Sequence, residues 1–163
     1  SPMIVPLIIT AAGMFFFYAR INLVYTFTGV ILAHVALATP FVVITVTATL
    51  VGFDMNMVKA AQSLGAKPMR TFFKVIMPLI LPGIISGALF AFITSFDEVV
   101  IVMFMASIDQ LTIPKQMWAG IRQEISPVIL CMATCLVILS IVLLTTVELL
   151  RRRAERLRGI KAR

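Results

Sequence analysis

The sequence predicts an all-α fold, a polytopic bundle of transmembrane helices. Hydrophobic residues make up 61% of the 163 residues and charged residues only 13%, whereas soluble domains are about 45–50% apolar. The mean hydropathy is +1.07. Long stretches carry no charge, and the cations gather between them. This composition excludes a large soluble catalytic domain.

Four stretches are long and apolar enough to cross a bilayer, which takes roughly 20 helical residues. We expect them at residues 3–19, 27–51, 75–96 and 125–150. The first is at the short limit and forms a helical hairpin with the second, around a polar turn at Arg20-Ile21-Asn22. The chain opens Ser1-Pro2-Met3-Ile4, without a basic segment before the first apolar run. We therefore expect this chain to be part of a longer protein whose first membrane spans it does not include.

The connecting segments assign sides to the bundle. Short loops rich in Lys and Arg stay in the cytoplasm, so we place residues 54–75 and the basic tail 151–163 there. The other two connections, which carry fewer cations or balance them with acids, face outward. With four spans, both visible ends of the chain are then cytoplasmic. On a soluble protein the net charge of +7 would suggest nucleic acid, but here it reports orientation, and no nucleic-acid partner is expected.

The cytoplasmic segment 54–75 contains an amphipathic helix. Asp54 can cap its start, and Gly65 fits its end. The apolar positions between them follow the spacing of one helical face, and they are Met57, Val58, Ala61 and Leu64. The pattern leaves two interpretations open, a helix that lies along lipid headgroups and a helix that docks on a partner.

Residues of this segment resemble the cytoplasmic loop motif of ABC importer permeases. Lys59-Ala60-Ala61, Gly65 and the run Val-Ile-Met-Pro at 75–78 match the spacing of E-A-A, three residues, G, nine residues, I-x-L-P. Lys59, Val75 and Met77 replace the motif's Glu, Ile and Leu. Further stretches resemble the spermidine/putrescine branch of these permeases, at residues 63–66, 79–84, 87–92, 95–100, 111–114, 120–122 and 125–127.

The resemblance implies a single permease domain (1–163) of an ATP-driven importer of polyamines, multi-pass in the bacterial inner membrane. Implied partners are a second permease subunit, an extracytoplasmic binding protein and two cytoplasmic ATPase subunits, besides membrane lipid. ATP belongs to the ATPase, since this chain lacks a G-x-x-x-x-G-K-[ST] loop. The chain itself is expected to be no enzyme and to hold no cofactor or metal.

The same resemblance implies the residues that dock on the ATPase. They are Asp54, Lys59, Ala60, Ala61, Leu64 and Gly65. Because Lys59 reverses the charge of the motif's Glu, a salt bridge made by that Glu cannot be transferred to this chain. Closure of the ATPase would move the docked helix as a lever whose far end is set by the breaks at Gly65 and Pro68.

Asp97 and Glu98 interrupt apolar sequence, although an acid at a helix centre costs about 2.5–3.5 kcal/mol on insertion scales. Two interpretations remain open. Either the third span ends at Asp97 and both acids meet outside water, or the helix starts after a kink at Pro78 and Pro82 and both acids face a deeper cavity. The resemblance favours the cavity.

In that case Asp97 and Glu98 replace the hydration of polyamine ammonium groups. Phe96 and Trp118 then supply walls for the methylene stems, although Trp118 also fits an interfacial anchor. His34 is expected to be a packed residue bonded to a neighbouring helix rather than a gate. The rival functions are the same architecture with another small solute as cargo, and a truncated membrane interaction protein without transport.

Overall fold

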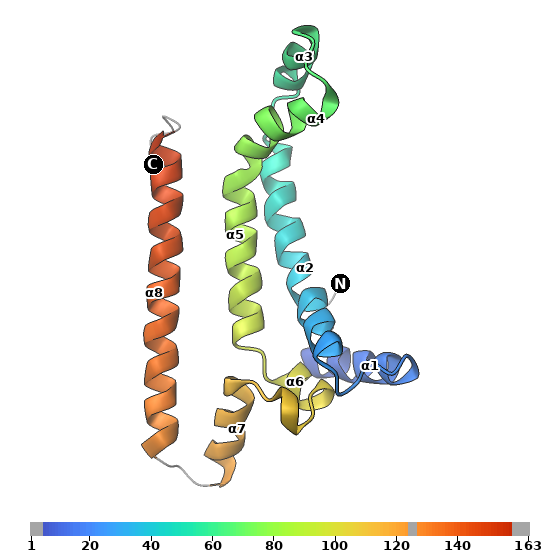
Figure 1. Cartoon of the computed structure of the whole chain (residues 1–163), viewed down its shortest axis with the longest axis vertical. Coiled ribbons are helices and arrows are strands. Elements are labelled where there is room, and N and C mark those ends of the chain that lie inside the picture. The colour runs from blue at the N-terminus through green and yellow to red at the C-terminus, as the bar shows by residue number, and fades with distance from the viewer. Residues whose placement is uncertain (1–4, 124–126, 158–163) are drawn as a thin grey trace.

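The computed structural model describes residues 5–123 and 127–157, and every regular element in these ranges is helical. The elements are α1 (Leu7–Arg20), α2 (Phe27–Val51), α3 (Asn56–Ser63), α4 (Pro68–Thr71), the π-helix η1 (Phe72–Ile76), α5 (Met77–Phe96), α6 (Val100–Met105), the short 3-10 helix η2 (Ile108–Gln110), α7 (Ile113–Gln123) and α8 (Pro127–Leu157). The long helices α2, α5 and α8 run along the same direction (Figure 1). Helices α3 and α4 lie at one end, and α1, α6 and α7 lie at the other.

Three helices are long and apolar enough to cross a membrane, and they correspond to three of the four predicted spans. They cover Phe27–Val51, Pro68–Phe96 and Pro127–Leu149. The second starts earlier than predicted because α4, η1 and α5 form one continuous helix. In the last, residues 125 and 126 of the predicted span lie outside the described residues, and the helix continues into the basic tail as far as Leu157.

The predicted first span is wrong for its described part, residues 5–19. Helix α1 has only 14 residues, packs mainly on α6 and lies across the foot of α2 instead of pairing along it (Figure 1). Positive φ angles at Asn22 and Tyr25 turn the chain after α1. The Tyr25 N–H then donates to the Met105 carbonyl at 2.9 Å. The described residues therefore do not form the predicted hairpin. The prediction that the visible N-terminus is cytoplasmic relied on four spans and is no longer supported.

Helices α2 and α5 form the closest pair among the long helices, along a seam of small residues. Gly83 and Gly87 are buried, and a Cβ at either position would collide with Thr49 or Thr45 of α2. Both threonine hydroxyls donate to carbonyls of their own helix, Thr45 to Phe41 and Thr49 to Thr45, at 2.9 Å each. The two glycines thus let α2 and α5 approach closely.

The π-helix explains how the chain passes through the proline-rich start of α5. Pro78 has no N–H for the carbonyl of Lys74, and the preceding N–H, of Met77, bonds the carbonyl of Phe72 five residues back. A wider π turn accommodates the missing bond without ending the helix. In place of the expected kink, the structure therefore has a π-helical turn before Pro78, within one continuous span.

The core lies at the end that holds α1, α6 and α7. Ile101, Val102 and Met105 of α6 are fully buried, and α6 is held at both ends by charged side chains. The Ile101 N–H donates to Glu98 Oε1 at 2.7 Å. Lys115 Nζ donates to the carbonyls of Val102 and Ala106 at 3.3 and 3.2 Å. The short helix is thus capped at its N-terminus by an acid and at its C-terminus by a base.

Candidate functional site

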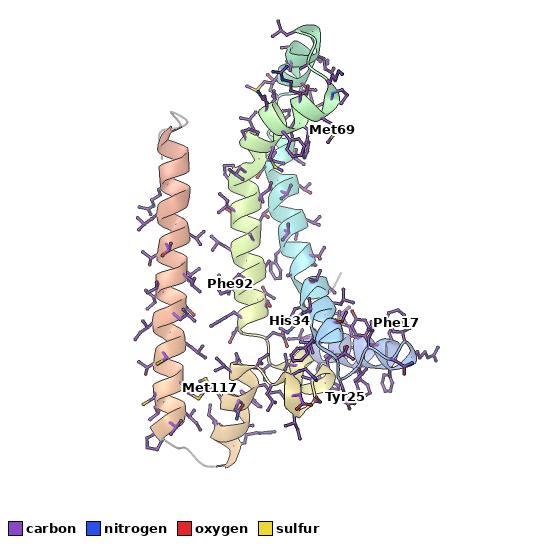
Figure 2. All side chains as sticks on the ribbon, in the orientation of Figure 1. Phe17, Tyr25, His34, Met69, Phe92 and Met117 are labelled. Atoms are coloured by element: carbon purple, nitrogen blue, oxygen red, sulfur yellow. The ribbon has the colours of Figure 1, made fainter. Side chains whose placement is uncertain are left out.

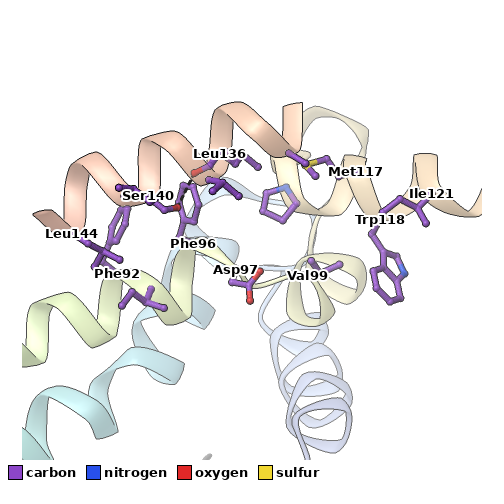
Figure 3. A pocket seen from close by; sticks show the side chains of 15 residues that line it. Phe92, Phe96, Asp97, Val99, Met117, Trp118, Ile121, Leu136, Ser140 and Leu144 are labelled. Atoms are coloured by element: carbon purple, nitrogen blue, oxygen red, sulfur yellow. Dashed lines mark hydrogen bonds between the residues drawn. The ribbon is translucent and has the colours of Figure 1, made fainter. Parts of the chain in front are cut away.

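A trough of about 530 Å³ lies between α5, α7 and α8. Phe92 and Phe96 form part of its α5 wall, with ring centroids 5.3 Å apart in a stacked arrangement, and Phe92 points toward α8 (Figure 2). Trp118 of α7 stands at the outer end of the trough (Figure 3). The α8 wall is formed by Ala133, Leu136, Val137, Ser140, Ile141 and Leu144.

Asp97 is the one charged side chain among the described residues that line this trough. It directly follows α5, and its N–H bonds the Ile93 carbonyl at 3.1 Å. The hydroxyl of Ser140, across the trough, donates to the Leu136 carbonyl of its own helix at 2.8 Å. A cation that entered the trough would therefore find one carboxylate on otherwise apolar and aromatic walls.

Glu98 lies outside the trough, although it is adjacent to Asp97. Its side chain is 6% exposed and accepts the Ile101 N–H at the start of α6. The chain turns between the two acids, so that they face different surroundings. The structure brings Asp97, Phe96 and Trp118 together in the trough. Glu98 instead caps the start of α6.

The position of Asp97 combines features of the two interpretations that the sequence left open. The residue ends a continuous helix, as expected if the span stops there. It also lines a cavity, as expected if the acid serves a path. The trough continues along α5 and α8 into a second hollow of about 310 Å³, which shares Phe92 and Leu144 with the first. The described lining of this second hollow is entirely apolar, so Asp97 is the only charged residue among the described residues that line the two hollows.

His34 joins two of the long helices. Its Nδ1 lies 2.8 Å from Ser95 Oγ of α5, while its Nε2 is buried without a hydrogen-bond partner in the described structure. The expectation of a packed histidine bonded to a neighbouring helix is confirmed. The bond fixes α2 against α5 two residues before Asp97.

The coupling segment, which we define as residues 54–75, projects beyond the ends of α2 and α5 (Figure 1). Asp54 Oδ1 accepts the Asn56 N–H at 2.9 Å, which confirms the predicted cap. Gly65 has φ of +81° after the end of α3, a backbone conformation that favours glycine. No residue of α3 is buried, and Leu64 is 89% exposed. Lys59 and Ala60 are exposed, whereas Ala61 is half-buried.

Sequence reasoning missed two contributors to this end of the molecule. It did not find the α8 wall of the trough, because α8 is apolar on all sides and offers no periodicity. It also did not find Lys115 as the C-terminal cap of α6. The available signal was a lysine near the start of the helix at 113–123, but its target, two backbone carbonyls of α6, cannot be identified from the sequence.

Comparison with known proteins places the chain in a family. A family model for the binding-protein-dependent transport system inner membrane component matches residues 2–156. The chain belongs to this family. Its members are transporter components of the inner membrane and not enzymes, and the predicted all-helical permease fold and the resemblance to ABC importer permeases are confirmed.

Several relatives carry polyamine names. The spermidine/putrescine transport system permease protein PotC of Haemophilus influenzae is 30% identical over 151 residues, which are 93% of this chain and 59% of the relative. PotC of Escherichia coli K12 is 30% identical over 92% of this chain and 57% of the relative. The putrescine transport system permease protein PotI of that strain is 37% identical over 103 residues, which are 63% of this chain and 37% of the relative. The chain thus spans less than two thirds of the length of these relatives.

Proposed function

We propose that this chain is a membrane-spanning subunit of an ATP-driven importer that moves polyamines. Family membership supports the transport role, and similarity to PotC and PotI supports the cargo. The observation that carries the cargo assignment is Asp97 at the end of an aromatic and apolar trough. A polyamine pairs ammonium groups with methylene stems, and this lining offers a partner for each.

Asp97 takes one ammonium group at a time. Its carboxylate replaces part of the lost hydration, and the faces of Phe92, Phe96 and Trp118 attract the cation and cover the stem. Because Asp97 is the only charge in the described lining, the site holds its cargo weakly enough to release it. Glu98 acts here as a positioning residue, because it caps the α6 helix that follows Asp97.

The coupling segment receives the force of the ATPase. Its residues Asp54 to Gly65 lie outside the bundle, with exposed apolar side chains for a partner to grip. Both this segment and the C-terminal end of α8 lie at the same end of the molecule (Figure 1), which supports a cytoplasmic location for both. A second permease subunit and an extracytoplasmic binding protein complete the importer.

The cargo assignment is tested by uptake of labelled putrescine and spermidine in the complete importer. We expect Asp97→Asn to lower uptake of both strongly, while Ser140→Ala retains uptake because its hydroxyl is occupied within α8. Competition with unlabelled monoamines separates a polyamine path from one for another small cation. Normal polyamine uptake by Asp97→Asn would remove the site assignment.

A further inference from the structure

We propose that the coupling segment is matched to an ATPase subunit whose docking cleft carries acidic side chains opposite Lys59 and its neighbouring cations. The inference rests on the proposed function, because it assumes that this segment docks on an ATPase. It adds the chemistry of the partner surface.

On the exposed surface of α3, Lys59 lies on the side away from the apolar stripe. Val58 and Ala61 are half-buried, on the side where α3 contacts α4 and η1. Lys59 is exposed, and the hydroxyl of Ser63 bonds its carbonyl at 2.9 Å without engaging its ammonium group. Four apolar side chains of the coupling segment are also 49–89% exposed, namely Met55, Met57, Leu64 and Met69.

The charge of the coupling segment is one-sided. Its cations are Lys59, Lys67, Arg70 and Lys74, against the single acid Asp54. Asp54 is used locally, since its carboxylate caps the Asn56 N–H. In the described part of the chain, no ion pair joins any of these four cations to an acid. The segment therefore presents unneutralised positive charge next to apolar side chains, and complementary potential on a partner is negative.

A protein cleft fits this surface better than lipid headgroups. A helix that lies on a membrane buries its apolar stripe in the lipid, but here Val58 and Ala61 of that stripe face the chain's own α4 and η1. The helix also stands beyond the ends of the long helices (Figure 1). Its exposed methionines suit a protein groove, because methionine adapts to irregular apolar surfaces.

Lys59 then acts as a specificity determinant. A cleft built to receive a glutamate at this position is positively charged and repels Lys59, whereas an acidic cleft attracts it. Such like-charge repulsion excludes wrong partners as effectively as attraction selects the right one. The inference therefore predicts that this chain discriminates among ATPase subunits by the charge opposite a single exposed residue.

The test uses the complete importer, purified with its own ATPase subunit through a tag on this chain. Variants Lys59→Glu and Lys59→Gln are compared with Arg20→Glu, which reverses an exposed charge at the opposite end of the molecule. We expect Lys59→Glu to retain the ATPase roughly tenfold more weakly at low salt, and Lys59→Gln to be intermediate. The difference shrinks as salt rises from about 0.05 to 0.5 M, because salt screens the charges. Arg20→Glu behaves as the wild type.

Replacing a candidate acid of the ATPase cleft by Lys should restore binding to Lys59→Glu. Equal retention of the ATPase by Lys59→Glu and wild type at low salt overturns the inference. So does an effect of Lys59→Glu that appears only in nanodiscs of anionic lipid, with retention unchanged in zwitterionic ones, since the partner is then the lipid.

Leu64→Asp separates this inference from the proposed function. It places a charge on the docking surface at an 89% exposed site. Loss of the ATPase at every salt concentration with Leu64→Asp, combined with no effect of Lys59→Glu, rejects the acidic cleft and keeps the docking. Full retention with both Leu64→Asp and Gly65→Pro rejects the docking itself.

Discussion

The two ends of this molecule are built in opposite ways. At the end with α1, α6 and α7, a short helix has three fully buried residues and is capped by Glu98 and Lys115. At the other end, α3 has no buried residue and stands free of the bundle. In the proposed function, this difference separates two tasks: the capped end would hold the trough in place, and the free end would offer its surface to the ATPase. Substitutions at the two ends should therefore affect different properties.

Stability should be most sensitive to substitutions in the contact between α2 and α5, which connects the two ends. Gly87→Leu forces a side chain into Thr45 and Val42 of α2, and overpacking of this kind costs about 1–3 kcal/mol or more. We expect loss of folded protein, measured by denaturant unfolding in detergent. Gly13→Ala is the matched control, because nothing lies within 4 Å of an added Cβ there. Its alanine should stabilise α1 slightly.

Substitutions of the two adjacent acids should differ in their effect on stability. Glu98→Ala removes the buried N-terminal cap of α6 and should destabilise the protein by about 0.5–2 kcal/mol. Asp97→Ala should leave stability within about 0.5 kcal/mol, because its side chain is exposed in the trough. Thermal unfolding in detergent, paired with polyamine uptake, measures both properties. If Asp97→Ala proved the more destabilising, the assignment of one residue to transport and the other to structure would fail.

The other cap of α6 should show a smaller effect. Lys115→Met keeps the apolar stem but removes the donors to Val102 and Ala106. We expect a loss of about 0.5–1.5 kcal/mol in unfolding free energy, with uptake falling only as far as folded protein falls. Lys115→Arg, which retains donors, serves as the control and should recover part of the loss. Unchanged stability in Lys115→Met would show that α6 needs no C-terminal cap.

The free end should show the smallest effect on stability. Leu64→Ser alters a side chain that is 89% exposed, and such changes usually stay within about 0.5 kcal/mol. Transport should nevertheless fall if Leu64 docks on the ATPase as proposed, because an apolar contact would then be lost. Val58→Ser, on the half-buried side of α3, is the comparison and should cost more stability. Marked unfolding of Leu64→Ser would indicate that the residue packs within its own chain.

Much of this arrangement could be predicted from local sequence. Spans at 27–51 and 75–96 follow from hydropathy, and the coupling segment follows from the cap at Asp54, the periodicity up to Leu64 and the break at Gly65. The first span could not be judged this way. Residues 7–20 are as apolar as a span, but the positive φ angles at Asn22 and Tyr25 and the bond from Tyr25 to Met105 turn them across the bundle.

The membrane class, the family and the amphipathic insert follow from the amino-acid sequence, because hydropathy, charge and motif spacing are properties of short stretches. The packing of the folded chain sets the rest: Asp97 faces a trough while Glu98 caps α6, and α8 supplies the opposite wall. The directions of neighbouring side chains at a helix end depend on how the chain turns there. In a helix that is apolar on every side, the sequence does not indicate which side is covered. Those choices depend on contacts between residues far apart in the chain.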